Sequence, residues 1–359
     1  MKILGIETSC DETAAAVVED GFRLLSNVVA TQIDIHAQYG GVVPEIAARS
    51  HIEAINPVIE KALVDAECSW DDIDAIAVTY APGLIGSLLA GALAARTLAI
   101  IHNKPLYGVQ HVEGHVYANF ITEQKPPLAL ELPSSQPQFP MLSLIVSGGH
   151  SQLVLFHDHG NYELLGQTQD DAVGEAFDKV AKILGLPYPG GPSIAKAALE
   201  GDAHKYSFPK AKLKGAYDFS FSGLKTAVLR AVQHAVGKDF TFPSHELAGL
   251  LTASQRNDFA ASFQRVAIES LVEKTVKAFL HYHAKSVVIA GGVAANHELR
   301  QQLRAALPIP IDYAPMTLCT DNAAMIASLG YFMAQTVAPV DPYVLEVIPS
   351  LSMTKTAWA

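Results

Sequence analysis

Ile3-Leu4-Gly5-Ile6-Glu7-Thr8-Ser9-Cys10-Asp11-Glu12-Thr13-Ala14-Ala15-Ala16-Val17-Val18 contains two short apolar runs, residues 3–6 and 14–18, with a polar segment between them. Apolar runs of this length predict two core strands joined as a hairpin. The connection, residues 7–13, is rich in hydroxyl and carboxylate side chains, which suit a phosphate or a metal-bound ligand. An ordinary solvated turn is the alternative interpretation.

The same arrangement returns in the middle of the chain. Residues 142–146 and 152–156 are again apolar, and Ser147-Gly148-Gly149-His150-Ser151 joins them. Adjacent glycines let backbone N–H groups converge on an anion, although Ser-Gly-Gly alone has low specificity. The repeated hairpin predicts an α/β protein with two duplicated lobes that face each other across a cleft.

The length of the chain also indicates two lobes. Its 359 residues exceed the size at which a single core usually stops growing. The proline-rich segment 125–140 is typical of a linker. We therefore expect an N-terminal lobe at residues 1–132, completed by a helix around residues 323–336, a C-terminal lobe at residues 133–322 and a tail at residues 337–359.

The charge balance is acidic. The chain has 25 Lys and Arg residues against 36 Asp and Glu residues, a formal net charge of −11. This balance disfavours a protein that binds nucleic acid by itself, because neutralising phosphates needs a basic face. The one concentrated group of lysines, in residues 205–214, predicts either a contact to a nucleic-acid backbone or a solvated loop.

The cysteines and the apolar segments indicate the compartment. Three cysteines without a CxxC pair favour neither a disulfide framework nor a structural zinc cluster. Glu7 and Asp11 come too early for the apolar core of a signal peptide. The most apolar stretch, residues 84–101, is interrupted by Arg96 and is typical of a packed helix rather than a membrane span. We expect a cytoplasmic protein that does not bind membranes.

Two histidines four residues apart form the clearest candidate site. In a helix, His111 and His115 lie on one face, with the spacing that two ligands of one metal ion need. Gly114 between them costs a helix about 1 kcal/mol relative to Ala, which indicates that a neighbour needs the space. The alternative is a pair of core or surface histidines.

The third ligand that we expect is Asp321, in a polar loop before the apolar run of residues 323–329. Two imidazoles and one carboxylate leave coordination positions open for a substrate oxygen.

Three further segments carry weaker signals. The helix expected at residues 171–184 contains Asp178 and is followed by a glycine- and proline-rich turn that can bring a helix face to the hydroxyls of a ligand. A strand at residues 286–290 enters a glycine pair and a helix, a nucleotide-binding geometry without the GxGxxG pattern. We expect Asp258 to cap a long amphipathic helix.

Along almost its whole length the sequence resembles the bacterial TsaD family of tRNA adenosine threonylcarbamoyltransferases, once labelled glycoproteases. The matching motifs are Gly5-Ile6-Glu7-Thr8-Ser9-Cys10-Asp11-Glu12-Thr13, His111-Val112-Glu113-Gly114-His115, Val146-Ser147-Gly148-Gly149-His150, Gly174-Glu175-Ala176-Phe177-Asp178-Lys179, Tyr188-Pro189-Gly190-Gly191-Pro192, Ala290-Gly291-Gly292-Val293-Ala294-Ala295-Asn296 and Cys319-Thr320-Asp321-Asn322.

The resemblance implies the two-lobed fold of actin, sugar kinases and heat-shock ATPases. It also implies one divalent metal ion per subunit, Fe(II) before Zn(II), held by His111, His115 and Asp321. The implied contacts to the adenylate substrate are Ser9, Ile145, Val146, Ser147, Gly148, Gly149, Asp178, Gly191 and Asn296. Many relatives have an aspartate where this chain has Ala195, so the ribose contact that the resemblance implies at this position stays open.

The implied reaction moves a threonylcarbamoyl group from threonylcarbamoyl-AMP to N6 of the adenosine 3′ of the anticodon, in tRNAs that read codons beginning with A. Asp11, or Glu12 in second place, is the candidate acceptor of the N6 proton, and either carboxylate can instead orient the threonyl part. The implied partners are tRNA, the paralogue TsaB and the ATPase TsaE. Because the chain is acidic, we expect the two protein partners to supply much of the basic surface that binds tRNA.

Two other classes compete with this hypothesis. A metallopeptidase needs His-Glu-x-x-His, whereas Glu113 lies two residues after His111, about 200° around the helix. A non-catalytic nucleotide-binding scaffold does not need three metal ligands.

Overall fold

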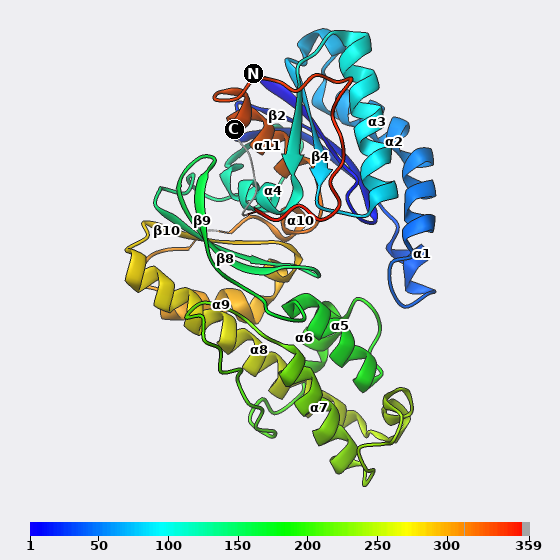
Figure 1. Ribbon diagram of the computed structural model, residues 1–359, viewed down its shortest axis with the longest axis vertical. Coiled ribbons are helices and arrows are strands. Elements are labelled where there is room, and N and C mark those ends of the chain that lie inside the picture. Colours follow the sequence, from blue (N-terminus) through cyan, green and yellow to red (C-terminus); the bar gives the residue numbers. More distant parts are fainter. Residues whose placement is uncertain (312, 354–359) are drawn as a thin grey trace. The chain divides into compact units, whose positions relative to one another are not determined.

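Two mixed β-sheets organise the chain in this computed structural model, which describes residues 1–311 and 313–353 (Figure 1). The chain forms two units. Unit 1 comprises Met1–Phe139, Phe156–Tyr162 and Asp312–Ala359, and unit 2 comprises Pro140–Leu155 and Glu163–Ile311. The first boundary falls at the end of the proline-rich linker, and the tail expected from residue 337 belongs to unit 1; its residues 354–359 lie outside the described part.

The elements follow each other in an α/β order. The strands are β1 (Lys2–Glu7), β2 (Glu12–Glu19), β3 (Arg23–Thr31), β4 (Ala75–Ala81), β5 (Leu106–Gln110), β6 (Glu123–Gln124), β7 (Met141–Val146), β8 (Ser151–Asp158), β9 (Asn161–Gln167) and β10 (Ser286–Ala290). The α-helices are α1 (Ile33–Ala37), α2 (Pro44–Ala66), α3 (Ile85–His102), α4 (His111–Tyr117), α5 (Val173–Leu184), α6 (Gly190–Ala198), α7 (Ser222–Ala235), α8 (Ala253–Tyr282), α9 (His297–Ala306), α10 (Met316–Cys319) and α11 (Ala323–Ala334). The 3₁₀ helices are η1 (Trp70–Asp72), η2 (Ala118–Phe120), η3 (Ser244–Leu250) and η4 (Gly292–Ala295).

The two sheets repeat one topology. The first has the strand order β5-β4-β1-β2-β3-β6, and the second has the order β10-β7-β8-β9. In each sheet a parallel strand, β4 or β10, pairs with the first strand of the meander, β1 or β7. The predicted hairpin of β1 and β2 is confirmed, and so is the duplication of mixed sheets. The apolar runs did not predict β3 and β9, the third strands of the two meanders.

Alternation along β1 explains how its sheet is covered on both faces. Leu4 and Ile6 point to one face and join the hydrophobic core with residues of α2 and α3. Gly5 points to the other face, where an added Cβ would lie 2.3 Å from the carbonyl oxygen of Ala323. The glycine therefore allows the backbone of α11 to rest directly on β1, and Figure 1 shows α11 on the opposite side of the sheet from α2 and α3.

Helix α8 begins earlier than its sequence suggested. Its N-cap is Thr252, whose side chain accepts a hydrogen bond from the backbone N–H of Gln255, so the prediction that Asp258 caps this helix is wrong. Asp258 instead lies inside α8 and accepts a hydrogen bond from the backbone N–H of Asp202. The reciprocal Thr252–Gln255 pair forms a capping box, in which each side chain accepts a hydrogen bond from the backbone N–H of the other residue.

Helix α3 is the one candidate for a membrane span in the described part of the chain, judged by length and hydropathy alone. All its buried residues except Leu88 are small, with Gly91, Ala92, Ala95 and Ala99 among them, and the helix contacts α2 and β4. A Cβ at Gly91 would lie 2.3 Å from the Thr8 hydroxyl oxygen. These small residues let α3 pack closely on unit 1.

The C-terminal segment follows the surface of unit 1. Val340 N donates to the carbonyl of Leu106, and Ile348 N donates to the carbonyl of Tyr80. The Arg96 guanidinium donates to the carbonyl of Pro342. The segment is thus tied to β5, β4 and α3.

Candidate metal centre and substrate loops

Helix α4 places both histidines on one face. Strand β5 runs directly into α4, and the Gln110 side chain accepts a hydrogen bond from Glu113 N at 2.7 Å, which caps the helix. His111 is consequently the first residue of α4, and His115 lies one turn later on the same face.

Close packing between α4 and α11 brings Asp321 to the histidines. A Cβ at Gly114 would lie 2.8 Å from the Ile326 Cδ1 atom, so the helix glycine makes room for α11. Asp321 precedes α11, whose N-cap Asn322 accepts a hydrogen bond from Met325 N at 3.1 Å. The Asp321 carboxylate, at the N-terminal end of α11, therefore faces the two histidines of α4.

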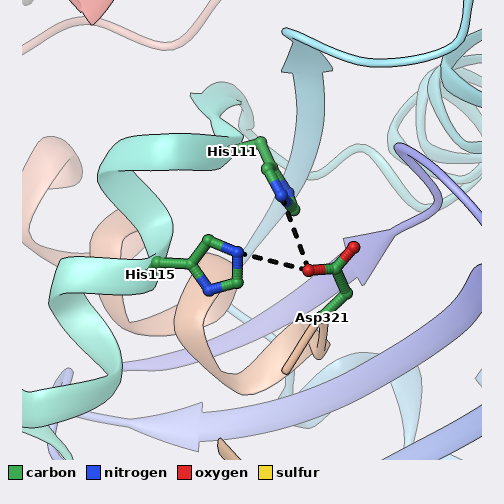
Figure 2. A group of neighbouring side chains, drawn as sticks. All are labelled: His111, His115 and Asp321. Carbon is green, nitrogen blue, oxygen red and sulfur yellow. Dashed lines mark ion pairs between the residues drawn. The ribbon is translucent and has the colours of Figure 1, made fainter. Parts of the chain in front are cut away.

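The three side chains converge (Figure 2). His115 Nε2 lies 3.2 Å from Asp321 Oδ1, and His111 Nε2 lies 3.6 Å from the same oxygen. One ligand atom from each residue lies within 4.8 Å of the other two. His115 is buried, and neither of its ring nitrogens has a hydrogen bond among the described residues. Buried imidazole nitrogens without hydrogen bonds, facing a carboxylate, fit one metal ion.

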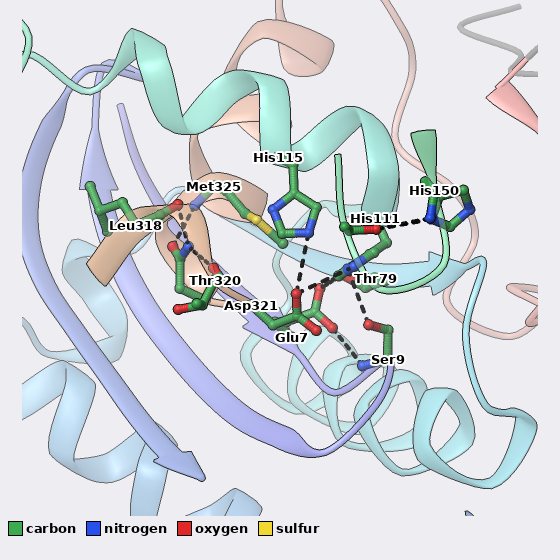
Figure 3. A network of polar contacts seen from close by, with 12 residues as sticks. Glu7, Ser9, Thr79, His111, His115, His150, Leu318, Thr320, Asp321 and Met325 are labelled. Atoms are coloured by element: carbon green, nitrogen blue, oxygen red, sulfur yellow. Dashed lines mark hydrogen bonds and ion pairs between the residues drawn. The ribbon is translucent and has the colours of Figure 1, made fainter. Parts of the chain in front are cut away.

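Glu7 lies behind His111 and was missed as a functional residue in the sequence analysis. Its Oε2 atom lies 3.0 Å from His111 Nδ1 and accepts a hydrogen bond from the Thr79 hydroxyl at 2.6 Å (Figure 3). The Glu7 side chain is fully buried. A carboxylate on one imidazole nitrogen orients the other nitrogen toward a metal. A glutamate that ends a core strand beside a polar loop was the available signal.

The carboxylates around His111 dominate its protonation. Burial lowers the pKa of His111, but Glu7 and Asp321 outweigh it and raise this pKa to about 9. Burial likewise raises the pKa of Glu7, and the facing His111 more than reverses that effect. These effects favour a proton on His111, which a metal ion bound at Nε2 would displace, because a ligating imidazole is neutral.

The polar loop after β1 reaches the same centre. Ser9 Oγ lies 3.1 Å from His111 Nδ1. Glu12 is turned toward β3, where its Oε1 accepts a hydrogen bond from the Thr31 hydroxyl at 3.3 Å. Burial, followed by the negative charges of Asp321 and Asp11, raises the pKa of Glu12 to about 9. The loop thus holds the Ser9 hydroxyl and the carboxylates of Asp11 and Glu12 near the candidate metal ligands.

In unit 2, the loop after β7 has the form of an anion cradle. Ile145 and Val146 end the strand, and Ser147 N donates to the His150 carbonyl at 2.8 Å, which closes a tight turn. Apart from the adjoining residues of the loop, no atom of the described residues lies within 4 Å of a Cβ built on Gly148 or Gly149, so space is open beside both glycines. Backbone N–H groups beside open space suit a phosphate.

Neighbouring elements of unit 2 support this loop. Gly291 has a φ of +87°, and a Cβ there would lie 2.5 Å from the Val146 carbonyl oxygen, so glycine is needed both for its conformation and for the close approach. Helix α5 begins at the same loop, where Gly174 N donates to the Ser147 carbonyl at 3.2 Å.

Asp178 and Asn296 already have local partners. Asp178 Oδ1 accepts a hydrogen bond from Gly190 N at 2.7 Å, and burial raises the pKa of Asp178. Asn296 caps α9 by accepting from Leu299 N at 3.1 Å. Gly191 has open space beside it. Asp178 thus holds the backbone at Gly190 and Asn296 holds the start of α9, and substrate binding by Asp178, Gly191 and Asn296 stays a prediction.

Two sheets of repeated topology and a His-His-Asp cluster define a class of α/β proteins with a candidate metal centre. The family profile described as TsaD, tRNA N6-adenosine threonylcarbamoyltransferase, matches residues 23–328. The relative in Thermomicrobium roseum, named tRNA N6-adenosine threonylcarbamoyltransferase, is 52% identical over 342 residues, which cover 93% of this chain and 92% of the relative. The relative of the same name in Symbiobacterium thermophilum is 54% identical over 334 residues, 92% of this chain and 91% of the relative. The chain belongs to the TsaD family.

Among solved structures, HypF of T. kodakarensis resembles this chain with a TM-score of 0.58 at 13% identity. The match covers 93% of this chain and 48% of HypF. This likeness concerns the fold alone, and together with the repeated sheet topology it confirms the predicted α/β fold class.

Proposed function

We propose that the chain transfers a threonylcarbamoyl group from threonylcarbamoyl-AMP to N6 of the adenosine 3′ of the anticodon, in tRNAs that read codons beginning with A. In this reaction the N6 nitrogen forms a bond to the carbamoyl carbon, the bond from that carbon to the AMP oxygen breaks, and N6 loses a proton. The single observation that carries the proposal is the convergence of His111, His115 and Asp321 in a member of this family.

The metal centre belongs to unit 1. His111, His115 and Asp321 would hold one divalent ion, which supplies Lewis-acid polarisation of a substrate oxygen when bound. Two histidines and one carboxylate with open positions are the donor set of non-haem Fe(II) sites, so we propose Fe(II), with Zn(II) as the alternative. Glu7 fixes the His111 ring through its 3.0 Å contact.

Asp11 is the proposed acceptor of the N6 proton. It follows Cys10 in the loop whose Ser9 hydroxyl contacts His111, and its backbone carbonyl accepts a hydrogen bond from Gln32 N at 3.2 Å. Glu12 is the second candidate, but its hydrogen bond from Thr31 directs it toward β3. A carboxylate at this position can remove a proton from an amine as that amine attacks.

Unit 2 would bind the adenylate. The open space beside Gly148 and Gly149 supports phosphate binding by the backbone N–H groups of residues 147–149. Asp178 would accept hydrogen bonds from ribose hydroxyls, and Gly191 and Asn296 would complete the adenylate contacts.

Partner subunits complete the proposed enzyme. We propose TsaB and TsaE as these subunits. Helix α3 exposes large apolar side chains, of which Ile85 is 61% exposed, Leu93 is 54% exposed and Ile101 is 68% exposed. An exposed apolar face of this kind supports contact with another subunit, and we assign it to TsaB.

The test is mass spectrometry of anticodon-loop nucleosides after the purified chain is incubated with its partners, threonylcarbamoyl-AMP and unmodified tRNA. We expect threonylcarbamoyladenosine with the wild type and a loss of at least about 100-fold with His115→Ala. His234→Ala is the matched control, because this exposed histidine near the end of α7 belongs to unit 2 and lies outside the cluster. Release of peptides from a protein substrate, without nucleoside formation, would instead support a metallopeptidase.

A further inference from the structure

The two units carry opposite net charges. Unit 2 contains 17 of the 25 Lys and Arg residues but only 14 of the 36 Asp and Glu residues, so its formal net charge is +3. Unit 1 contains the other 8 basic and 22 acidic residues, a formal net charge of −14. The net charge of the whole chain is acidic although unit 2 by itself is basic. Unit 2 can therefore contribute to the basic surface that tRNA binding needs, in addition to the surface expected from partner subunits.

Lysines of unit 2 gather around one cavity. A cavity of about 290 Å³ lies between α5, α7 and η3, and its wall includes Lys179, Lys182, Lys225, Thr226, Ser244 and His245. Phosphate oxygens can accept hydrogen bonds from all the polar groups of this wall, which are three ammonium groups, an imidazole and two hydroxyls. Figure 1 shows α5 and α7 in the same helical part of unit 2.

Carboxylates outside the cavity wall hold two of these lysines. Lys179 Nζ lies 2.8 Å from Asp171 and 2.7 Å from Glu175, and Lys225 Nζ lies 2.8 Å from Asp171. Lys182 has no ion pair among the described residues and is exposed. Three lysines against two carboxylates leave a net positive charge, and Lys182 supplies it.

His245 contributes less than the lysines do. Its Nε2 lies 3.7 Å from Glu246 Oε1, and both side chains are largely exposed. Solvent screens this pair, so the attraction for an anion rests on the lysines, and above all on Lys182.

Helix α5 connects the proposed adenylate loop with the wall of the cavity. Gly174 at the start of α5 contacts the Ser147 carbonyl, and Lys182 comes eight residues later on that helix. A rise of 1.5 Å per residue separates the two positions by roughly 12 Å along the axis. When the target adenosine of the tRNA reaches the adenylate bound at this loop, a neighbouring backbone phosphate of the tRNA therefore comes within reach of Lys182.

We propose that the cavity between α5, α7 and η3 binds a backbone phosphate of the tRNA substrate, with Lys182 as its principal contact. The inference rests on the proposed function, because tRNA is the nucleic acid which that function requires. An isolated phosphate contact strengthens binding without reading sequence, so it acts on every tRNA substrate alike.

Fluorescence anisotropy with unmodified tRNA tests the contact on the chain assembled with its partners, at several salt concentrations. We expect Lys182→Gln to raise the Kd for tRNA about 3- to 10-fold at about 0.1 M salt, and to reduce the slope of log K against log salt by about 1. Glu175→Gln removes a charge beside Lys179 and should lower the Kd. Lys104→Gln, the same change beside a cavity of unit 1, should leave the Kd unchanged.

Three results would overturn the inference. The first is a Kd and a salt slope that neither Lys182→Gln nor Glu175→Gln alters. The second is a higher KM for threonylcarbamoyl-AMP in Lys182→Gln with unchanged tRNA affinity, which would assign the cavity to the small substrate. The third is weakened subunit assembly with unchanged tRNA affinity, which would assign it to an acidic protein face. Nucleoside analysis of the wild type separately decides the proposed function, because tRNA binding through Lys182 does not require product formation.

Discussion

The carboxylate of Glu7 lies 3.0 Å from Nδ1 of His111, and this pair is buried within unit 1. The contact determines which nitrogen of His111 is left for a metal ion, because Nδ1 is already engaged and Nε2 faces Asp321 at 3.6 Å. One residue of the first strand thereby orients a ligand on a helix that begins more than a hundred positions later.

Glu7→Gln should weaken metal binding. The neutral amide orients the His111 ring less strongly than the carboxylate does, and loss of such an outer partner typically lowers metal affinity about 10- to 100-fold. Competition with a chelator, read out as bound metal per chain, measures the effect without any activity assay. The control is Glu53→Gln on the exposed side of α2, which should retain full affinity. Equal affinity in the two variants would contradict the role of Glu7.

Asp11→Asn should lower kcat for nucleoside formation by about 100-fold or more, because proton transfer by a positioned side chain contributes that much. The KM for tRNA should change little, since the carboxylate acts on the amine only in the transition state. Glu12→Gln should have the smaller effect, because Glu12 is hydrogen-bonded to Thr31. The reverse order of the two variants would move the assignment to Glu12.

Gly5→Ala should destabilise unit 1 by about 3 kcal/mol or more. The new methyl group would lie 2.3 Å from the Ala323 carbonyl oxygen and 2.7 Å from Ala327 N, and backbone atoms of a packed helix cannot move aside as a flexible side chain can. Urea unfolding measures the loss. Gly223→Ala is the matched change in α7, where, in the part of the chain that the structure describes, no atom beyond the adjoining turns of the helix lies within 4 Å of the added Cβ. It should be neutral or stabilise by up to about 1 kcal/mol through helix propensity.

Asp171 should contribute stability that depends on pH. Burial raises the pKa of Asp171, but hydrogen bonds from Lys179 and Lys225 outweigh it and bring this pKa down to about 2. Because the pKa is lower in the folded state, the stabilisation is complete above the ordinary aspartate pKa of about 4 and is lost as pH falls toward 2.

The free energies of unfolding of the wild type and Asp171→Asn, measured by urea titration, should therefore differ by about 1 kcal/mol from pH 7 to pH 5, after allowance for solvent screening, and converge between pH 4 and pH 2. Asp65→Asn, which breaks the exposed pair of Asp65 with Lys61, should have little effect at any pH. A difference for Asp171→Asn that stays constant down to pH 2 would show that Lys179 and Lys225 do not lower its pKa.

The sequence by itself determined the local elements. Short continuous apolar runs indicated the two opening hairpins, and the spacing of His111 and His115 indicated a helix with both rings on one face. These features depend on residues close together in the chain, so a linear pattern contains the required information. Asp258 shows the limit of such patterns, because the capping box at Thr252 and Gln255 set the helix start instead.

Only the tertiary structure decided which distant residues meet. Glu7 became a partner of His111 because β1 and β4 are adjacent in the sheet and β5 delivers α4 beside them, and no local pattern encodes that adjacency. The opposite charges of the two units likewise appeared only when residues were grouped by contact rather than by position. Which distant residues meet depends on how closely two backbones approach each other. Glycines such as Gly5, which lies against α11, allow this close approach, and the packing between elements far apart in the sequence determines it.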